Sequence, residues 1–288
     1  MLAFLKSNAP DVEPDIAGQR ARMDALGDFF PVPDGTQVEP ATIGGVKGEW
    51  VRAKGARKDA ALLYLHGGGY VIGSPKSHRH LIAALSEASG LSVFAPDYRM
   101  APEHPFPAAI DDTVAVYKGL IDSGIRAARL CISGDSAGGG LTIATLVAAR
   151  DKGLKMPACA VAISPWADLS QGGEAYRTRL ARDPMITKDG LDQMAAAYLG
   201  GKDAKTPLAS PLFADLKGLP PLLLQVGTEE ALYSDTTQWK TRAEDAGVQV
   251  LAESWAGMMH VWHFFHPILS EGRDAVARIG SYLKAHVE

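Results

Sequence analysis

The sequence predicts an α/β fold in which a mostly parallel central β-sheet is flanked by helices. Short apolar runs alternate with amphipathic stretches from about residue 45 to the end of the chain. The later apolar runs are continuous and rich in Val, Ile and Leu, which is typical of parallel strands buried on both faces. One of these runs also passes through a glycine-rich turn directly into a helical stretch. Together these observations indicate strand–helix units wound around one sheet.

The elements follow from this alternation in chain order. Apolar runs predict strands at 48–53, 60–65, 92–95, 128–133, 159–164, 221–226 and 249–253. Amphipathic stretches predict helices at 77–88, 108–123, 136–152, 234–246 and 267–286.

Composition and charge restrict the function classes. The chain has 288 residues, is 47% hydrophobic and carries a net charge of −4, so it can bury a sizeable core and is not expected to bind nucleic acid. No segment has the roughly 20 apolar residues that span a membrane. The N-terminus has no signal-peptide pattern. Cys131 and Cys159 each lie in an apolar run, which predicts buried thiols without a disulfide framework. These features predict a cytoplasmic protein without membrane insertion.

The segment Gly134-Asp135-Ser136-Ala137-Gly138 fits the pattern G-x-S-x-G at a junction from strand to helix. So tight a turn strains its central residue and requires small neighbours. It would lift Ser136 clear of the sheet, at the positive end of the following helix. We therefore predict that Ser136 is a nucleophile and that Asp135 orients the turn. The alternative is a glycine-rich loop for close packing or phosphate binding.

A second glycine-rich segment, His66-Gly67-Gly68-Gly69-Tyr70, follows the predicted strand 60–65. Successive glycines allow backbone N–H groups to converge on one point, which an oxyanion hole needs. We predict that the N–H groups of Gly68, Gly69 and Ala137 form it, and that His66 anchors the loop. A phosphate-binding loop is the alternative, although no Gly-Lys-Ser/Thr follows.

Along the chain, a serine nucleophile on such a turn is followed first by its acid and then by its histidine base. His260 comes directly after the last predicted strand and is the expected base. Its rivals, His263 and His266, lie in an aromatic stretch, while His78 and His80 lack the further ligands of a metal site. The loop after strand 221–226 offers three acids by chemistry alone, which are Glu229, Glu230 and Asp235.

Two segments interrupt the alternation. Residues 1–40 are polar and helix-leaning, and residues 168–210 separate the strands 159–164 and 221–226. We predict that both form a helical cap over Ser136, on a core made of residues 41–167 and 211–288; surface decoration is the alternative. The apolar cap residues line a substrate pocket or form the cap's own core: Met23, Phe29, Phe30, Met185, Leu191 and Met194.

The chain resembles the hormone-sensitive-lipase-type esterases, the bacterial family IV carboxylesterases of the α/β-hydrolase fold. The resemblance rests on the segments 66–69, 97–109, 134–139, 164–166 and 257–260, in the family's order. The family's acid is an Asp followed by Pro-Leu, thirty residues before the His. Glu230 lies thirty positions before His260 and is followed by Ala231-Leu232. This register selects Glu230 and marks a departure, because Glu replaces Asp.

The resemblance implies hydrolysis of short-to-medium-chain acyl esters through Ser136, His260 and Glu230. It implies no metal or organic cofactor, a small-molecule ester as substrate, and it allows a homodimer. Tyr70 and Trp166 are candidate pocket walls. Two alternatives stay open: an amidase or lactonase with the same residues, or a non-catalytic receptor for a small molecule.

Overall fold

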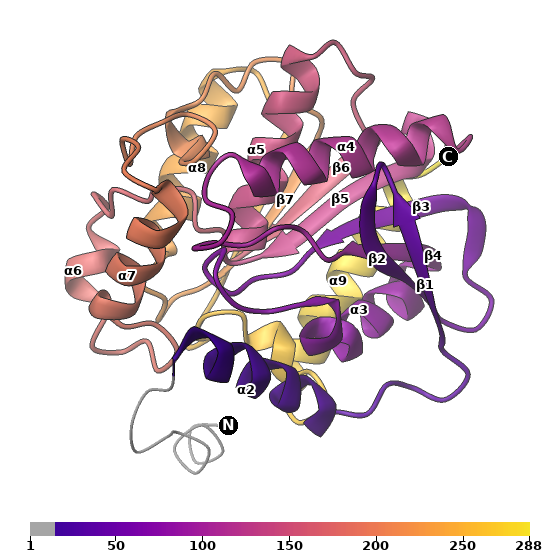
Figure 1. Cartoon of the computed structure of the whole chain (residues 1–288), viewed down its shortest axis with the longest axis horizontal. Coiled ribbons are helices and arrows are strands. Elements are labelled where there is room, and N and C mark those ends of the chain that lie inside the picture. The colour runs from indigo at the N-terminus through magenta and orange to yellow at the C-terminus, as the bar shows by residue number, and fades with distance from the viewer. Residues whose placement is uncertain (1–14) are drawn as a thin grey trace.

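An eight-stranded sheet in the order β1-β2-β4-β3-β5-β6-β7-β8 forms the centre of the molecule (Figure 1). This computed structural model describes residues 15–288. The sheet is parallel from β4 to β8, while β1–β2 and β2–β4 are antiparallel. The strands are β1 (Gln37–Ile43), β2 (Val46–Arg52), β3 (Arg57–Leu65), β4 (Leu91–Pro96), β5 (Leu130–Asp135), β6 (Cys159–Ile163), β7 (Leu222–Gly227) and β8 (Val250–Trp255).

Helices cover both faces of the sheet, which confirms the predicted α/β class (Figure 1). Alternate residues of β3 point to opposite faces and enter two separate apolar clusters. One cluster packs under α4 (Ala108–Asp122), α5 (Ala137–Asp151) and α8 (Tyr233–Asp245). The other packs under α3 (Pro75–Ser89) and α9 (Ser270–His286). The thiols of Cys131 and Cys159 are buried in the second cluster, as the sequence predicts, and their Sγ atoms lie 3.5 Å apart.

Strand β1 was not predicted, because its residues are largely exposed and include Pro40. It pairs with β2 through a two-residue turn at Gly44 and Gly45, both with positive φ. That Gly-Gly pair is a hairpin signal in the sequence, since both turn positions need left-handed backbone. Residue 40, the expected end of the first cap segment, therefore lies inside β1.

The other elements lie close to their expected positions. The strand expected at 128–133 is β5 at Leu130–Asp135, because a short 3₁₀ helix (Ala127–Arg129) precedes it. The segment 168–210 contains α6 (Ala175–Thr178) and α7 (Lys188–Leu199), and a 3₁₀ turn (Pro211–Phe213) returns the chain to the core. A further 3₁₀ helix, η3 (Trp262–Phe265), precedes α9.

Helix α2 (Ile16–Phe29) is the described helix of the N-terminal segment, and the rest of the expected cap at residues 1–14 lies outside the described residues. Arg20 fastens α2 to the core by two hydrogen bonds of 2.8 Å to the Glu103 carboxylate. It also donates to the Val71 carbonyl at 2.8 Å. This places α2 beside the loop that follows β3.

Candidate active site

Ser136 occupies the turn between β5 and α5 with a φ of 54° and a ψ of −121°. A positive φ is uncommon for a residue with a side chain and marks strain that the surroundings must hold. The neighbours leave no room for larger residues: a Cβ on Gly138 would lie 2.0 Å from the Leu65 carbonyl oxygen. The turn therefore presents Ser136 at the N-terminal end of α5, where the helix dipole favours negative charge.

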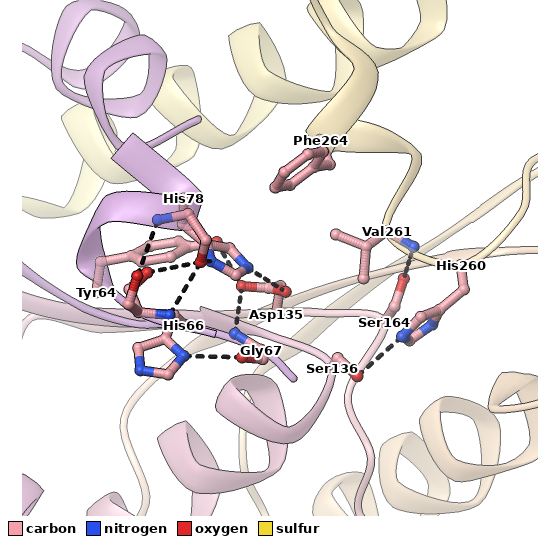
Figure 2. A network of polar contacts seen from close by, with 12 residues as sticks. Tyr64, His66, Gly67, His78, Asp135, Ser136, Ser164, His260, Val261 and Phe264 are labelled. Atoms are coloured by element: carbon pink, nitrogen blue, oxygen red, sulfur yellow. Dashed lines mark hydrogen bonds and ion pairs between the residues drawn. The ribbon is translucent and has the colours of Figure 1, made fainter. Parts of the chain in front are cut away.

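Ser136, His260 and Glu230 form a continuous line of hydrogen bonds. Ser136 Oγ lies 2.8 Å from His260 Nε2 (Figure 2), and His260 Nδ1 lies 3.0 Å from Glu230 Oε2. Each residue follows a parallel strand, since β5 precedes Ser136, β7 precedes Glu230 and β8 precedes His260. The carboxyl ends of these strands share one edge of the sheet, so side chains up to 124 positions apart meet there.

Glu230 is fully buried, with 0% of its surface exposed. Its Oε1 accepts hydrogen bonds from Ser164 Oγ at 2.7 Å and from the Gly227 N–H at 2.6 Å. Burial raises the pKa of Glu230, and the hydrogen bonds from His260, Gly227 and Ser164 oppose that rise without cancelling it. The carboxylate is thus held in one orientation by three donors.

Burial also lowers the pKa of His260, but the hydrogen bond to Glu230 and its charge outweigh this effect. The charges of Asp183 and Asp135 act in the same direction, so the net pKa of His260 lies above its ordinary value.

Ser164 is a site residue whose role the sequence did not reveal. Besides donating to Glu230, its Oγ accepts the N–H of Val261 at 3.3 Å, next to His260 (Figure 2). It therefore joins the acid to the loop that carries the histidine. Ser164 reaches both neighbours because it directly follows β6, which lies between β5 and β7 in the sheet. That sheet order is not readable from the sequence.

The other candidate acids point elsewhere. Glu229 Oε2 lies 3.3 Å from the Arg182 guanidinium. Asp235 is buried and accepts the N–H groups of Ala167 and Asp168 at 2.8 and 2.9 Å. Neither carboxylate contacts His260. The register of the sequence and the geometry thus favour the same residue, Glu230.

The rival histidines contact other parts of the protein. His263 Nε2 lies 2.7 Å from Gln225 Oε1, and burial lowers the pKa of His263 to about 3. His80 is buried, and its Nε2 lies 2.8 Å from the Phe264 carbonyl oxygen. The His266 ring stacks against the His80 ring. Among residues 15–288, no three His, Cys, Asp or Glu side chains come together to hold a metal ion.

The loop after β3 is fastened to the serine turn by Asp135. Its Oδ1 accepts the N–H of Gly67 at 3.0 Å and the hydroxyl of Tyr64 at 2.7 Å (Figure 2). His66 Nδ1 lies 2.8 Å from the Gly67 carbonyl oxygen, and its ring stacks on Tyr98 with centroids 4.3 Å apart. Asp135 therefore sets the loop relative to Ser136, and His66 braces it.

Gly68 and Gly69 occupy left-handed backbone, with φ of 112° and 63°. A side chain is disfavoured there, so glycine lets the chain turn toward Ser136. Within the described part of the chain, the N–H groups of these two glycines have no protein acceptor. Both residues line the same cavity as Ser136 and His260. They therefore leave two donors available beside the serine.

The cavity over Ser136 has a volume of about 160 Å³ and a mainly apolar lining. Helix α2 contributes Met23 and Leu26, so both interrupting segments reach the cavity. The segment 168–210 and the core contribute the other apolar walls: Met185, Ile186, Leu191, Met194, Ile72, Trp166, Val261 and Phe264.

Three candidate lining residues lie elsewhere. Phe29 is 61% exposed, and Phe30 packs against Phe264 and Phe265 in the core. Tyr70 is buried and stacks on Tyr198 of α7, with ring centroids 3.7 Å apart. Phe30 and Tyr70 support the walls from behind, because they pack against the lining residues Phe264 and Trp166. The remaining candidates, Met23, Met185, Leu191, Met194 and Trp166, line the cavity.

Comparisons with known proteins identify the fold and the family. The sequence profile of the alpha/beta hydrolase fold matches residues 62–264. An acetyl-hydrolase of Streptomyces hygroscopicus is 49% identical over 276 residues, covering 95% of this chain and 90% of the relative. An esterase of Acinetobacter venetianus is 34% identical, covering 91% and 87%.

Solved structures extend the similarity to the whole fold. A crystal structure of an esterase from the bacterial hormone-sensitive lipase family has a TM-score of 0.97 and 45% identity, covering 100% of this chain and 97% of that one. An esterase/lipase from an uncultured bacterium has a TM-score of 0.95 and 48% identity, covering 99% and 96%. No helix within residues 15–288 is long and apolar enough to cross a membrane. The chain belongs to the bacterial hormone-sensitive-lipase family of serine carboxylesterases, which have the α/β-hydrolase fold.

Proposed function

We propose that the protein hydrolyses short-chain carboxylic esters, with Ser136 as nucleophile, His260 as base and Glu230 as the acid that orients it. The observation that carries this proposal is the hydrogen-bonded line from Ser136 Oγ through His260 to Glu230, at a small apolar cavity. A nucleophile in reach of a base, with the base held by a buried carboxylate, is the arrangement that acyl transfer needs.

The reaction proceeds through an acyl-enzyme. His260 Nε2 accepts the Ser136 proton while Oγ bonds to the ester carbonyl carbon. The N–H groups of Gly68, Gly69 and Ala137 stabilise the resulting oxyanion. His260 then gives its proton to the departing alcohol as the carbon–oxygen bond breaks. A water then attacks the acyl carbon while His260 takes its proton. His260 returns this proton to Ser136 Oγ as the acyl–oxygen bond breaks, which releases the carboxylic acid and free Ser136.

The size of the cavity limits the acyl group. Pockets for drug-sized ligands measure about 300–1,000 Å³, so a cavity of about 160 Å³ suits a small acyl group. Met23 and Met194 line it from separate cap segments. The names of two relatives agree with small acyl groups: the acetyl-hydrolase described above and an ethyl acetate hydrolase of Pseudomonas putida, which is 32% identical over 235 residues.

The chain-length preference is tested with p-nitrophenyl acetate, butyrate, octanoate and palmitate. We expect kcat/KM to be highest for acetate or butyrate and to fall at least about tenfold by octanoate, because the longer chain must displace the cap residues. A matched p-nitroanilide of the best acyl group separates ester from amide hydrolysis. A preference for palmitate would contradict the cavity argument. No turnover of any ester above the Ser136→Ala background would revive the receptor hypothesis.

Gly68→Ala tests the oxyanion loop. A Cβ at this position would lie 2.2 Å from the Ile72 carbonyl oxygen, on backbone with a φ of +112°. The loop must therefore shift, and we expect kcat to fall about 100-fold, as when one oxyanion donor is lost. Gly45→Ala is the matched control, because its φ of +84° is equally left-handed but its surroundings are open. Gly45→Ala should lower only Tm; unchanged kcat in Gly68→Ala would refute the assignment.

From the sequence we also propose a cytoplasmic location, and the family resemblance allows a homodimer.

A further inference from the structure

The segment 168–210 reaches the loop that carries Glu230 through a buried carboxylate. Asp183 is only 7% exposed, and its Oδ2 accepts the N–H of Ala231 at 3.0 Å. Its Oδ1 accepts the N–H of Met185, also at 3.0 Å, and Met185 lines the cavity. Ala231 is the residue directly after Glu230. One side chain therefore joins the acid loop to a cavity wall.

Two arginines near Asp183 in the chain contact the same loop. Arg179 donates to the Thr228 carbonyl, and its guanidinium lies 3.8 Å from the centre of the Tyr233 ring. Arg182 pairs with Glu229, but both side chains are partly exposed, so that pair contributes little. The Asp183 bond differs because it is charge-assisted and buried. It is the contact best placed to hold the loop.

The residue at position 231 makes this contact available. In the resembling family the acid is followed by proline, which has no backbone N–H and cannot donate. This chain has Ala231 there, together with Glu230 in place of the family's Asp. The two departures stand next to each other in the sequence. The N–H of Ala231 gives the loop a hydrogen bond that a proline would remove.

We propose that Asp183 is a positioning residue: it holds the Glu230 loop through the Ala231 N–H and so makes the cap segment part of the catalytic site. This inference rests on the proposed function of Glu230 and His260. Asp183 does not touch the reacting atoms, and it acts through the loop and through its charge.

The charge of Asp183 reaches the base as well. The titratable groups that act electrostatically on His260 are Glu230 after β7, Asp183 from the cap segment, Asp135 at the end of β5 and His263 from η3. Burial lowers the pKa of His260, whereas the three carboxylates raise it. Since His260 accepts a proton only when neutral, activity falls as pH drops through this pKa. Removing the charge of Asp183 should therefore move the acid limb of the pH profile to lower pH.

Two single variants separate the two effects. Asp183→Asn keeps the volume but loses the charge and one acceptor, so we expect kcat to fall about 10- to 100-fold through misplacement of the loop, and the acid limb to move down. Ala231→Pro removes the N–H and keeps the charge. We expect a similar fall in kcat with the acid limb in place. Arg182→Ala, an exposed neighbour of Asp183, is the control and should keep both properties.

The double variant tests whether Asp183 acts through Ala231. If it does, Asp183→Asn combined with Ala231→Pro costs no more kcat than the worse single variant. Fully additive losses would overturn the proposal, as would wild-type kcat in both single variants. A lower Tm of Asp183→Asn without a shift of the acid limb of its pH profile would show that Asp183 has a purely structural role. This result would also overturn the proposal. Active wild-type protein with an inactive Ser136→Ala variant shows that the proposed function stands in any of these cases.

Discussion

Replacing Ser136 with Ala is expected to lower kcat for p-nitrophenyl butyrate by about 10⁴-fold or more, since the acyl-enzyme can no longer form. Ser136 Oγ lies 2.8 Å from His260 Nε2, so this hydroxyl is the one that the base can deprotonate. The fold should be retained, because alanine is smaller and occupies the same strained backbone at φ 54°. Stopped-flow absorbance should lose any burst of p-nitrophenol, while Tm stays close to that of the wild type.

Ser133→Ala is the matched control for this variant. Ser133 lies on β5, three residues before Ser136, and its buried Oγ has no hydrogen-bond partner among the described residues. Removing an unpaired buried hydroxyl leaves no partner unsatisfied, so both activity and Tm should remain near the wild-type values. Residual activity of Ser136→Ala within tenfold of the wild type would show that another nucleophile serves the reaction.

Glu230→Gln is expected to lower kcat by about 10⁴-fold while leaving the fold intact. The amide oxygen can still accept from Ser164 Oγ and the Gly227 N–H, which bond to Oε1. The amide NH₂ then faces His260 Nδ1, where Oε2 lies now, and it can only donate. His260 must then adopt the tautomer in which Nδ1 is unprotonated and accepts from the amide. In this tautomer Nε2 carries the proton, so it cannot take the proton of Ser136.

The neighbouring residue provides the control for the acid. Glu229→Gln makes the same chemical change one position away, where the carboxylate contacts Arg182 and not His260. We expect its kcat/KM to stay within about threefold of the wild type, since surface ion pairs contribute little. Glu230→Asp should retain partial activity, because the charge remains on a side chain one carbon shorter. A fully active Glu230→Gln enzyme would assign the acid's role to another residue.

Most of the fold could be read from periodicity, because buried parallel strands are continuous apolar runs. The strands β3 to β7 are runs of this kind, and the helices between them also follow from the sequence pattern. Strand β1 escaped because an exposed edge strand needs no apolar face, and its Pro40 argues against a strand. Pairing with β2 and the packing of Ala41 and Ile43 against the first cluster stabilise it. A largely exposed edge strand such as β1 is therefore the kind of element that this pattern misses.

The cavity could be anticipated only in outline. The apolar cap residues were visible in the sequence, but whether each faces substrate space or the core depends on how α2 and α7 dock. Met23 and Met194 line the cavity, whereas Phe30 turns into the core and Phe29 into solvent. Helix periodicity shows which residues share a face, and packing against distant elements selects what that face contacts.

The sequence by itself determined the local machinery of this esterase. The turn around Ser136 and the glycine loop at Gly68 and Gly69 are readable because backbone sterics act between neighbouring residues. Only the tertiary structure decided which distant groups serve that machinery. Ser164 meets Glu230 because β6 lies between β5 and β7, and Asp183 meets Ala231 because the cap segment folds back onto the core. Such contacts depend on packing between elements far apart in the chain, and no local pattern records them.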